Sequence, residues 1–140
     1  MPDNRQSSIV NRPIAVTALA LLVLTLSAWN GLRLGAAIAS WQVLIEYGAK
    51  PLYIAISGST WALAGITLFA GLWRGKAWAR KMAYITAAGY ASWVWFDRLV
   101  LQTPHANWPF ALAVTVALLS FTIITLSLRG SKFFFSKRGA

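Results

Sequence analysis

Ionisable side chains that could do chemistry are scarce in this sequence. Its 140 residues include three acids, one histidine and no cysteine. The acids are Asp3, Glu46 and Asp97, and the histidine is His105. Acid–base catalysis and metal binding need several such groups to converge, and no two of these have the spacing of a metal site. One histidine also cannot supply both axial ligands of a haem, so we expect no enzyme activity, no metal and no cofactor.

The most unusual of these groups is the adjacent pair Asp97 and Arg98, which lies inside the end of an apolar run in the segment "SWVWFDRLVLQ". Successive residues on a helix point about 100° apart, so the two charges cannot share a face. We expect Asp97 to face Arg33, and Arg98 to reach a lipid phosphate or Glu46. Together with Asn30, one turn before Arg33, these residues form a predicted polar cluster at the outer membrane surface.

A functional interpretation of the same pair remains open. In it, Asp97 takes up protons or holds a cation at an outward-facing site, and Tyr90 and Trp93 line the approach on the same helix face. This interpretation predicts a small oligomeric transporter or channel with a polar entrance around Asp97. The shallow position of Asp97 and the nearby Arg33 favour the structural interpretation. His105 is expected to be a solvated turn residue.

The elements that position these residues are long apolar runs. The chain is 58% hydrophobic and 11% charged, whereas soluble domains carry about 25% charged residues. Four runs reach the roughly 20 residues needed to cross a bilayer, and backbone groups in lipid must be satisfied within each run. The sequence therefore predicts an all-α integral membrane protein with four transmembrane helices in a single domain, 1–140. The predicted spans are 13–32, 51–72, 82–101 and 109–128.

The segments outside these spans also have recognisable patterns. Apolar residues on one side of 34–47 predict a short helix lying in the outer interface. The segment 129–140, "RGSKFFFSKRGA", mixes basic and aromatic residues and predicts a tail that docks on the anionic cytoplasmic leaflet. Because the first span has full transmembrane length, we expect it to be retained rather than cleaved as a signal peptide.

Basic residues predict the orientation in the membrane. Of thirteen Lys and Arg residues, all but Arg33, Lys50 and Arg98 fall on the two tails and the second connection. Because cytoplasmic flanks collect Lys and Arg, we expect both termini in the cytoplasm of a bacterial inner membrane. The basic residues follow the ends of apolar runs rather than one soluble face, so the net charge of +10 does not predict nucleic-acid binding.

Small residues predict where the helices pack. In lipid, helices associate where small side chains let backbones approach, so stripes of Gly and Ala mark candidate interfaces. Three runs carry such stripes: Gly31 and Gly35 in the first, Ala55, Gly58, Ala62 and Gly65 in the second, and Ala83, Ala87 and Ala91 in the third.

The segment "GLWRGKAWAR" (71–80) resembles the cytoplasmic turn of small bacterial four-helix multipass membrane proteins, a resemblance that implies no activity. Small multidrug transporters also have four short spans, but the first span here lacks the membrane-embedded glutamate of that family. We therefore expect a non-catalytic accessory or scaffolding subunit. Its expected partners are the lipid bilayer and either larger membrane proteins or further copies of itself.

Overall fold

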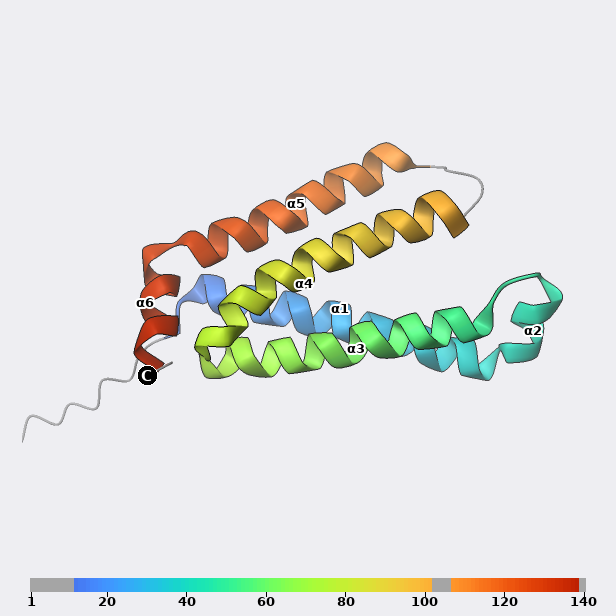
Figure 1. Ribbon diagram of the computed structural model, residues 1–140, viewed down its shortest axis with the longest axis horizontal. Helices are drawn as coiled ribbons and strands as arrows, with labels where there is room; N and C mark the ends of the chain where they lie inside the picture. The colour runs from blue at the N-terminus through green and yellow to red at the C-terminus, as the bar shows by residue number, and fades with distance from the viewer. Residues whose placement is uncertain (1–11, 102–106, 139–140) are drawn as a thin grey trace, which may run out of the picture.

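The computed structural model describes residues 12–101 and 107–138, all of which are helical or lie in short connections (Figure 1). These residues form an all-α structure with six α-helices. In order, the elements are α1 (Ile14–Ala39), α2 (Trp41–Glu46), α3 (Pro51–Arg74), α4 (Ala77–Phe96), the π-helical turn η1 (Asp97–Leu101), α5 (Trp108–Ser127) and α6 (Arg129–Arg138).

Three of the long helices, α1, α3 and α5, are long and apolar enough to cross a membrane. This finding supports a multi-pass membrane protein. The 20-residue helix α4 is not among these three, and it carries Arg80 and Lys81 in its first turns. A fourth crossing by α4 therefore stays a prediction.

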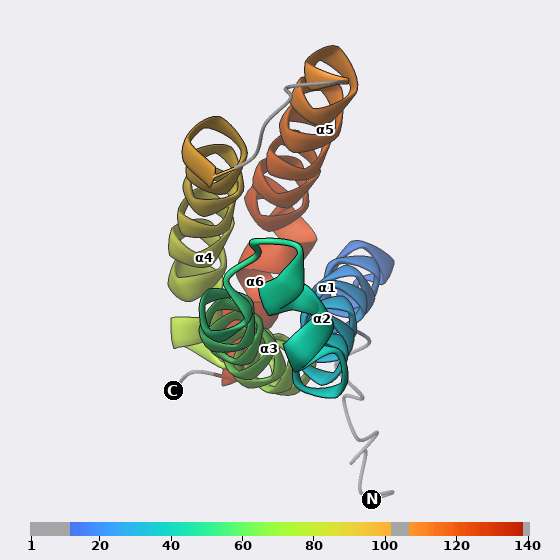
Figure 2. The same cartoon turned by 90° about the vertical axis from the view of Figure 1, so that its right-hand side faces the viewer.

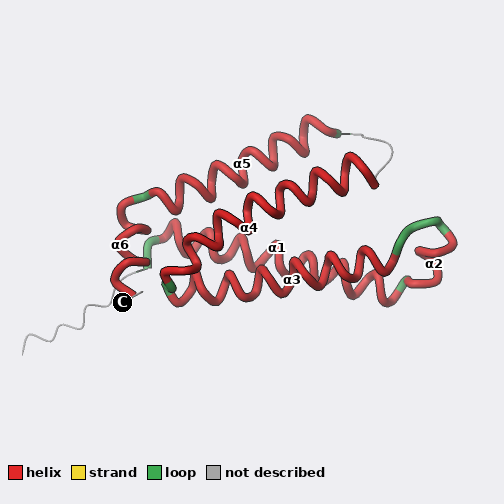
Figure 3. The backbone as a smooth tube through the Cα atoms, in the orientation of Figure 1, coloured by secondary structure: helices red, strands yellow, loops and turns green. Residues whose placement is uncertain are grey.

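The long helices run up and down as two hairpins (Figure 3). α1 and α3 form the first hairpin, with α2 in its connection, and α4 and α5 form the second. The hairpins converge at the end where α6 lies, here called the α6 end, and diverge towards the opposite α2 end. Figure 2, which looks from the α2 end, shows α4 and α5 leaning away from the α1–α3 pair.

A glycine makes the tight turn between the two hairpins. Gly75 has φ 68°, the left-handed conformation that closes many helices. Its N–H donates to the Leu72 carbonyl at 3.2 Å, and the Lys76 N–H donates to the Gly71 carbonyl at 3.0 Å. These two bonds satisfy the last carbonyls of α3, so α4 begins at Ala77, five residues before the predicted start of the third span.

The buried core lies at the α6 end. All four long helices and α6 contribute to it, with Val16, Leu19, Ala20, Leu68, Leu72, Ala79, Ala83, Leu126, Phe134 and Phe135. The tail predicted to dock on the leaflet is thus a helix that covers the end of the bundle. Phe134 and Phe135 are 1% and 2% exposed, whereas Phe133 is 58% exposed. The converging helices leave an apolar end, and α6 buries two of its three phenylalanines there.

The connection after the first span also differs from the prediction. A single helix was expected over 34–47, but residues 34–39 continue α1, and only Trp41–Glu46 form a separate short helix. Gly31 and Gly35 do not end α1, because a glycine inside a helix costs only about 1 kcal/mol.

Candidate functional site

Helices α1 and α3 approach each other closely. The Ser27 hydroxyl donates to the Ala62 carbonyl at 2.6 Å. A Cβ atom added at Gly65 would lie 2.8 Å from Ser27 Cβ, and one added at Gly58 would lie 3.0 Å from the Asn30 carbonyl oxygen. The predicted stripe on α3 therefore lies directly against α1. Its remaining member, Ala55, is half-buried.

The predicted stripe on α1 has a different environment. A Cβ atom added at Gly31 or Gly35 would meet nothing within 4 Å. Ala28, Leu32 and Gly35 are exposed, and these positions share one side of the helix with Gly31. This surface, defined by Ala28, Gly31, Leu32 and Gly35, is called the glycine face below. Within the described residues, no helix of the chain covers it.

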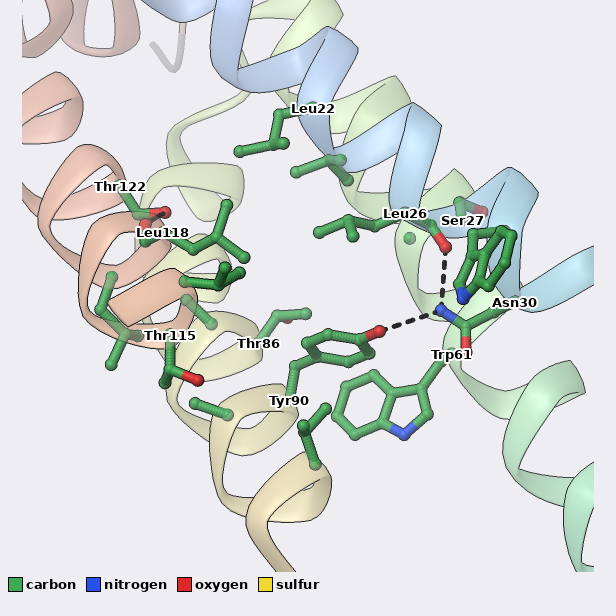
Figure 4. Close-up of a pocket in the computed structure, with 18 of the residues that line it drawn as sticks. Leu22, Leu26, Ser27, Asn30, Trp61, Thr86, Tyr90, Thr115, Leu118 and Thr122 are labelled. Atoms are coloured by element: carbon green, nitrogen blue, oxygen red, sulfur yellow. Dashed lines mark hydrogen bonds between the residues drawn. The ribbon is translucent and has the colours of Figure 1, made fainter. Parts of the chain in front are cut away.

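The predicted stripe on α4 lines a cavity of about 410 Å³ between the two hairpins. Ala83, Ala87 and Ala91 all face this space, which α1, α3 and α5 also border. Because the hairpins diverge, the short alanine side chains do not bridge the gap. Figure 4 shows the lining side chains, most of which are apolar.

Two cavity threonines have their hydroxyls satisfied by their own helix. Thr115 donates to the Ala111 carbonyl at 2.8 Å, and Thr122 donates to the Leu118 carbonyl at 2.9 Å. Thr115 also accepts a bond from Trp95 Nε1 at 3.2 Å, which joins α5 to α4.

Asn30 is a cavity residue whose hydrogen bonding is incomplete. It is 1% exposed, and its Nδ2 donates to the Leu26 carbonyl at 2.8 Å and to the Tyr90 hydroxyl at 3.4 Å (Figure 4). A backbone carbonyl only accepts, so the Leu26 bond fixes which end of the amide is nitrogen. The Asn30 Oδ1 atom is buried and has no hydrogen-bond partner.

Aromatic rings gather beside Asn30. The Trp61 and Tyr90 rings meet edge to face at 5.0 Å between centroids. Trp93 lies 5.8 Å from Trp61 and 5.9 Å from Tyr90. These rings join α3 to α4, and Trp61 and Tyr90 also line the cavity.

The predicted polar cluster divides into two parts. On one side, Arg33 lies over the Trp93 ring at 5.5 Å from its centroid. Tyr53 on α3 lies near both Asp97 and Arg33, although its buried hydroxyl has no hydrogen-bond partner among the described residues. Asp97 is 9% exposed. The structure thus brings Arg33 and Asp97 to one environment around Tyr53, a residue that the sequence analysis did not select.

Arg98 and Glu46 are placed apart. Arg98 lines the cavity, whereas Glu46 is exposed on α2. Asp97, the neighbour of Arg98 in the chain, is not among the residues that line the cavity. His105 lies outside the described residues. No group of three or more potential metal ligands occurs among the residues that the structure describes.

No protein-family model, curated protein or solved structure matches this chain. The resemblance of the segment 71–80 to small multipass membrane proteins is therefore supported only by the apolar helices themselves.

Proposed function

We propose that the chain crosses the membrane four times, with both termini in the cytoplasm. α4 and α5 each have 20 residues and run side by side between the two ends of the bundle. Because α4 connects the end of α3 to the start of α5, it must cross the same thickness of membrane as these two helices. Basic residues gather at the α6 end, including Arg74 and Lys76 at the α3–α4 turn, as cytoplasmic flanks do.

We further propose that the protein is a non-catalytic accessory or scaffolding subunit. The observation that carries this proposal is the glycine face. Gly31 and Gly35 form a G-x-x-x-G pattern, which lets another helix approach the backbone closely in lipid. The comparable glycines of α3, Gly58 and Gly65, are already in contact with α1. The glycine face is open, so it is suited to a helix from another chain.

The occupant of the glycine face is expected to be an apolar transmembrane helix with small residues of its own. It belongs either to a larger membrane protein or to a second copy of this chain. An entrance around Asp97, as in a transporter, gains no comparable support. Arg98 lines the described cavity, but Asp97 is not among its lining residues.

The experiment is to replace both glycines by leucine, Gly31→Leu and Gly35→Leu, and to measure the mass of the native complex in mild detergent. The control is Ala113→Leu with Ala117→Leu, a pair of exposed small residues with the same spacing on α5. We expect a complex larger than the 15.3 kDa chain for the wild type and the control. The glycine variant should run as a monomer.

The mass also identifies the partner. A multiple of the chain mass indicates self-association, and any other mass indicates a different subunit. A wild-type protein that is itself a monomer, or a glycine variant that keeps the complex, would contradict the proposed role.

A further inference from the structure

The cavity between the hairpins has walls that favour hydrocarbon. Its lining is mostly leucine, valine, alanine and aromatic side chains. Its volume of about 410 Å³ falls within the roughly 300–1,000 Å³ of small-molecule sites. Along α1, the lining runs from Leu19 to Asn30, which is about 16 Å at 1.5 Å per residue. A long, narrow and apolar space at this depth fits a hydrocarbon chain better than water, which needs several polar partners.

Asn30 is one of the few polar residues in these walls, with Ser27, Thr86, Arg98, Thr115 and Thr122. Asn30 Oδ1 is a buried acceptor without a partner, and such a group is costly unless something donates to it. The amide nitrogen of Asn30 is already bonded to Leu26 and Tyr90. The Tyr90 hydroxyl accepts from Asn30, which leaves its own proton to donate. The pair therefore offers one acceptor and one donor, side by side.

A hydroxyl group satisfies both requirements at once. Its proton is donated to Asn30 Oδ1, and its oxygen accepts from Tyr90. A carbonyl or ether oxygen has no proton to donate, so it would leave Oδ1 unsatisfied. The rings of Trp61 and Tyr90 form an apolar and aromatic wall next to this position.

From these observations we infer that the cavity binds a lipid alcohol from the bilayer, with its hydroxyl between Asn30 and Tyr90 and its hydrocarbon chain along α1, α4 and α5. This binding site is separate from the glycine face, so it does not depend on the proposed role as an accessory subunit.

The first test uses 1-hexadecanol and its methyl ether, in which a methyl group replaces the hydroxyl hydrogen. Each is titrated into the purified full-length protein in detergent as a mole fraction of the micelle. Thermal unfolding is followed, and retained ligand is counted by native mass spectrometry. We expect half-saturation by the alcohol at a mole fraction about fivefold lower, the factor that corresponds to one net hydrogen bond. Equal binding of the two probes, or binding of neither, would overturn the inference.

The second test uses neighbouring substitutions on α4. Ala87 lines the cavity, whereas Ala88 is exposed on another side of the helix. Ala87→Phe should fill the space and abolish binding of 1-hexadecanol, and Ala88→Phe should leave it unchanged. Retention of the alcohol by a folded Ala87→Phe protein would contradict the assigned location. If that variant does not fold, Ala91→Phe provides the same test one turn further along.

A third variant separates the hydroxyl contact from the hydrocarbon contact. Asn30→Leu removes the acceptor but keeps a side chain of similar size. We expect it to bind the alcohol and the ether equally. A variant that still prefers the alcohol would show that Asn30 does not receive the hydroxyl proton.

Discussion

Adding one methyl group to α3 at Gly65 should push α1 and α3 apart. In Gly65→Ala, the new Cβ would lie 2.8 Å from Ser27 Cβ and 3.4 Å from Ser27 Cα. These atoms cannot move away by a rotamer change, so the helices must separate. Overpacking of this kind costs about 1–3 kcal/mol. The separation also weakens the bond from Ser27 to Ala62, and such bonds average about 0.6 kcal/mol in membranes. Alanine regains about 1 kcal/mol through its helix propensity.

The matched control is Gly89→Ala on α4, because Gly89 is exposed and a Cβ there would make only an ordinary contact with Trp61 at 3.7 Å. It should gain about 1 kcal/mol from helix propensity alone. The free energies of unfolding of the two variants should therefore differ by about 1–3.5 kcal/mol, which is the cost of overpacking plus that of the weakened hydrogen bond, because the gain from helix propensity is the same in both. The assay is reversible unfolding in mixed micelles with increasing dodecyl sulfate, followed by circular dichroism. Equal stabilities of Gly65→Ala and Gly89→Ala would refute the close α1–α3 contact.

Two further predictions test other contacts of the fold. Ser27→Ala removes the 2.6 Å bond to Ala62 and should lower the free energy of unfolding by about 0.6–1.7 kcal/mol in the same assay. Thr60→Ala should have little effect, because Thr60 is exposed and bonds only within its own helix. Phe134→Ala should release α6 at a cost of about 3 kcal/mol or more, measured as faster hydrogen exchange in α6. Phe133→Ala should not change hydrogen exchange in α6, because Phe133 is 58% exposed. Equal exchange in the two variants would contradict the docking of α6.

The helices could be predicted because their signal is local. A run such as 109–128 is apolar in itself, and its helix begins at Trp108 next to Pro109 as expected for a first-turn proline. Helix ends were less predictable. Hydropathy does not decide whether α1 stops near Leu32 or continues to Ala39. The end depends on the small free-energy cost of two glycines inside the helix.

The neighbours of each small residue could not be predicted. Gly31 and Gly35 are four residues apart and Gly58 and Gly65 are seven apart, so each pair lies on one face of its helix, yet only the second pair contacts another helix. A stripe of small residues shows which side of a helix can be approached, but it does not show which helix approaches. The sequence analysis did not predict the cavity for this reason. Ala87 lines it only because the two hairpins diverge.

The polar cluster shows the same limit. The different directions of Asp97 and Arg98 follow from helix geometry alone. The environment of Asp97 depends on Tyr53, which lies on another helix and has no unusual sequence context. The lack of a hydrogen-bond partner for Asn30 Oδ1 likewise depends on the positions of Leu26 and Tyr90, and no sequence pattern predicts it.

The central claim is that α4 makes a fourth crossing with the α6 end in the cytoplasm. Because the chain has no cysteine, single cysteines can be placed without background at Ala49, Lys76, Asn107 and Ser136. A maleimide that cannot cross membranes should label positions 49 and 107 in intact cells, and positions 76 and 136 only after the membrane is permeabilised. Labelling of positions 76 and 107 from the same side would show that α4 does not cross, and would contradict the four-span account.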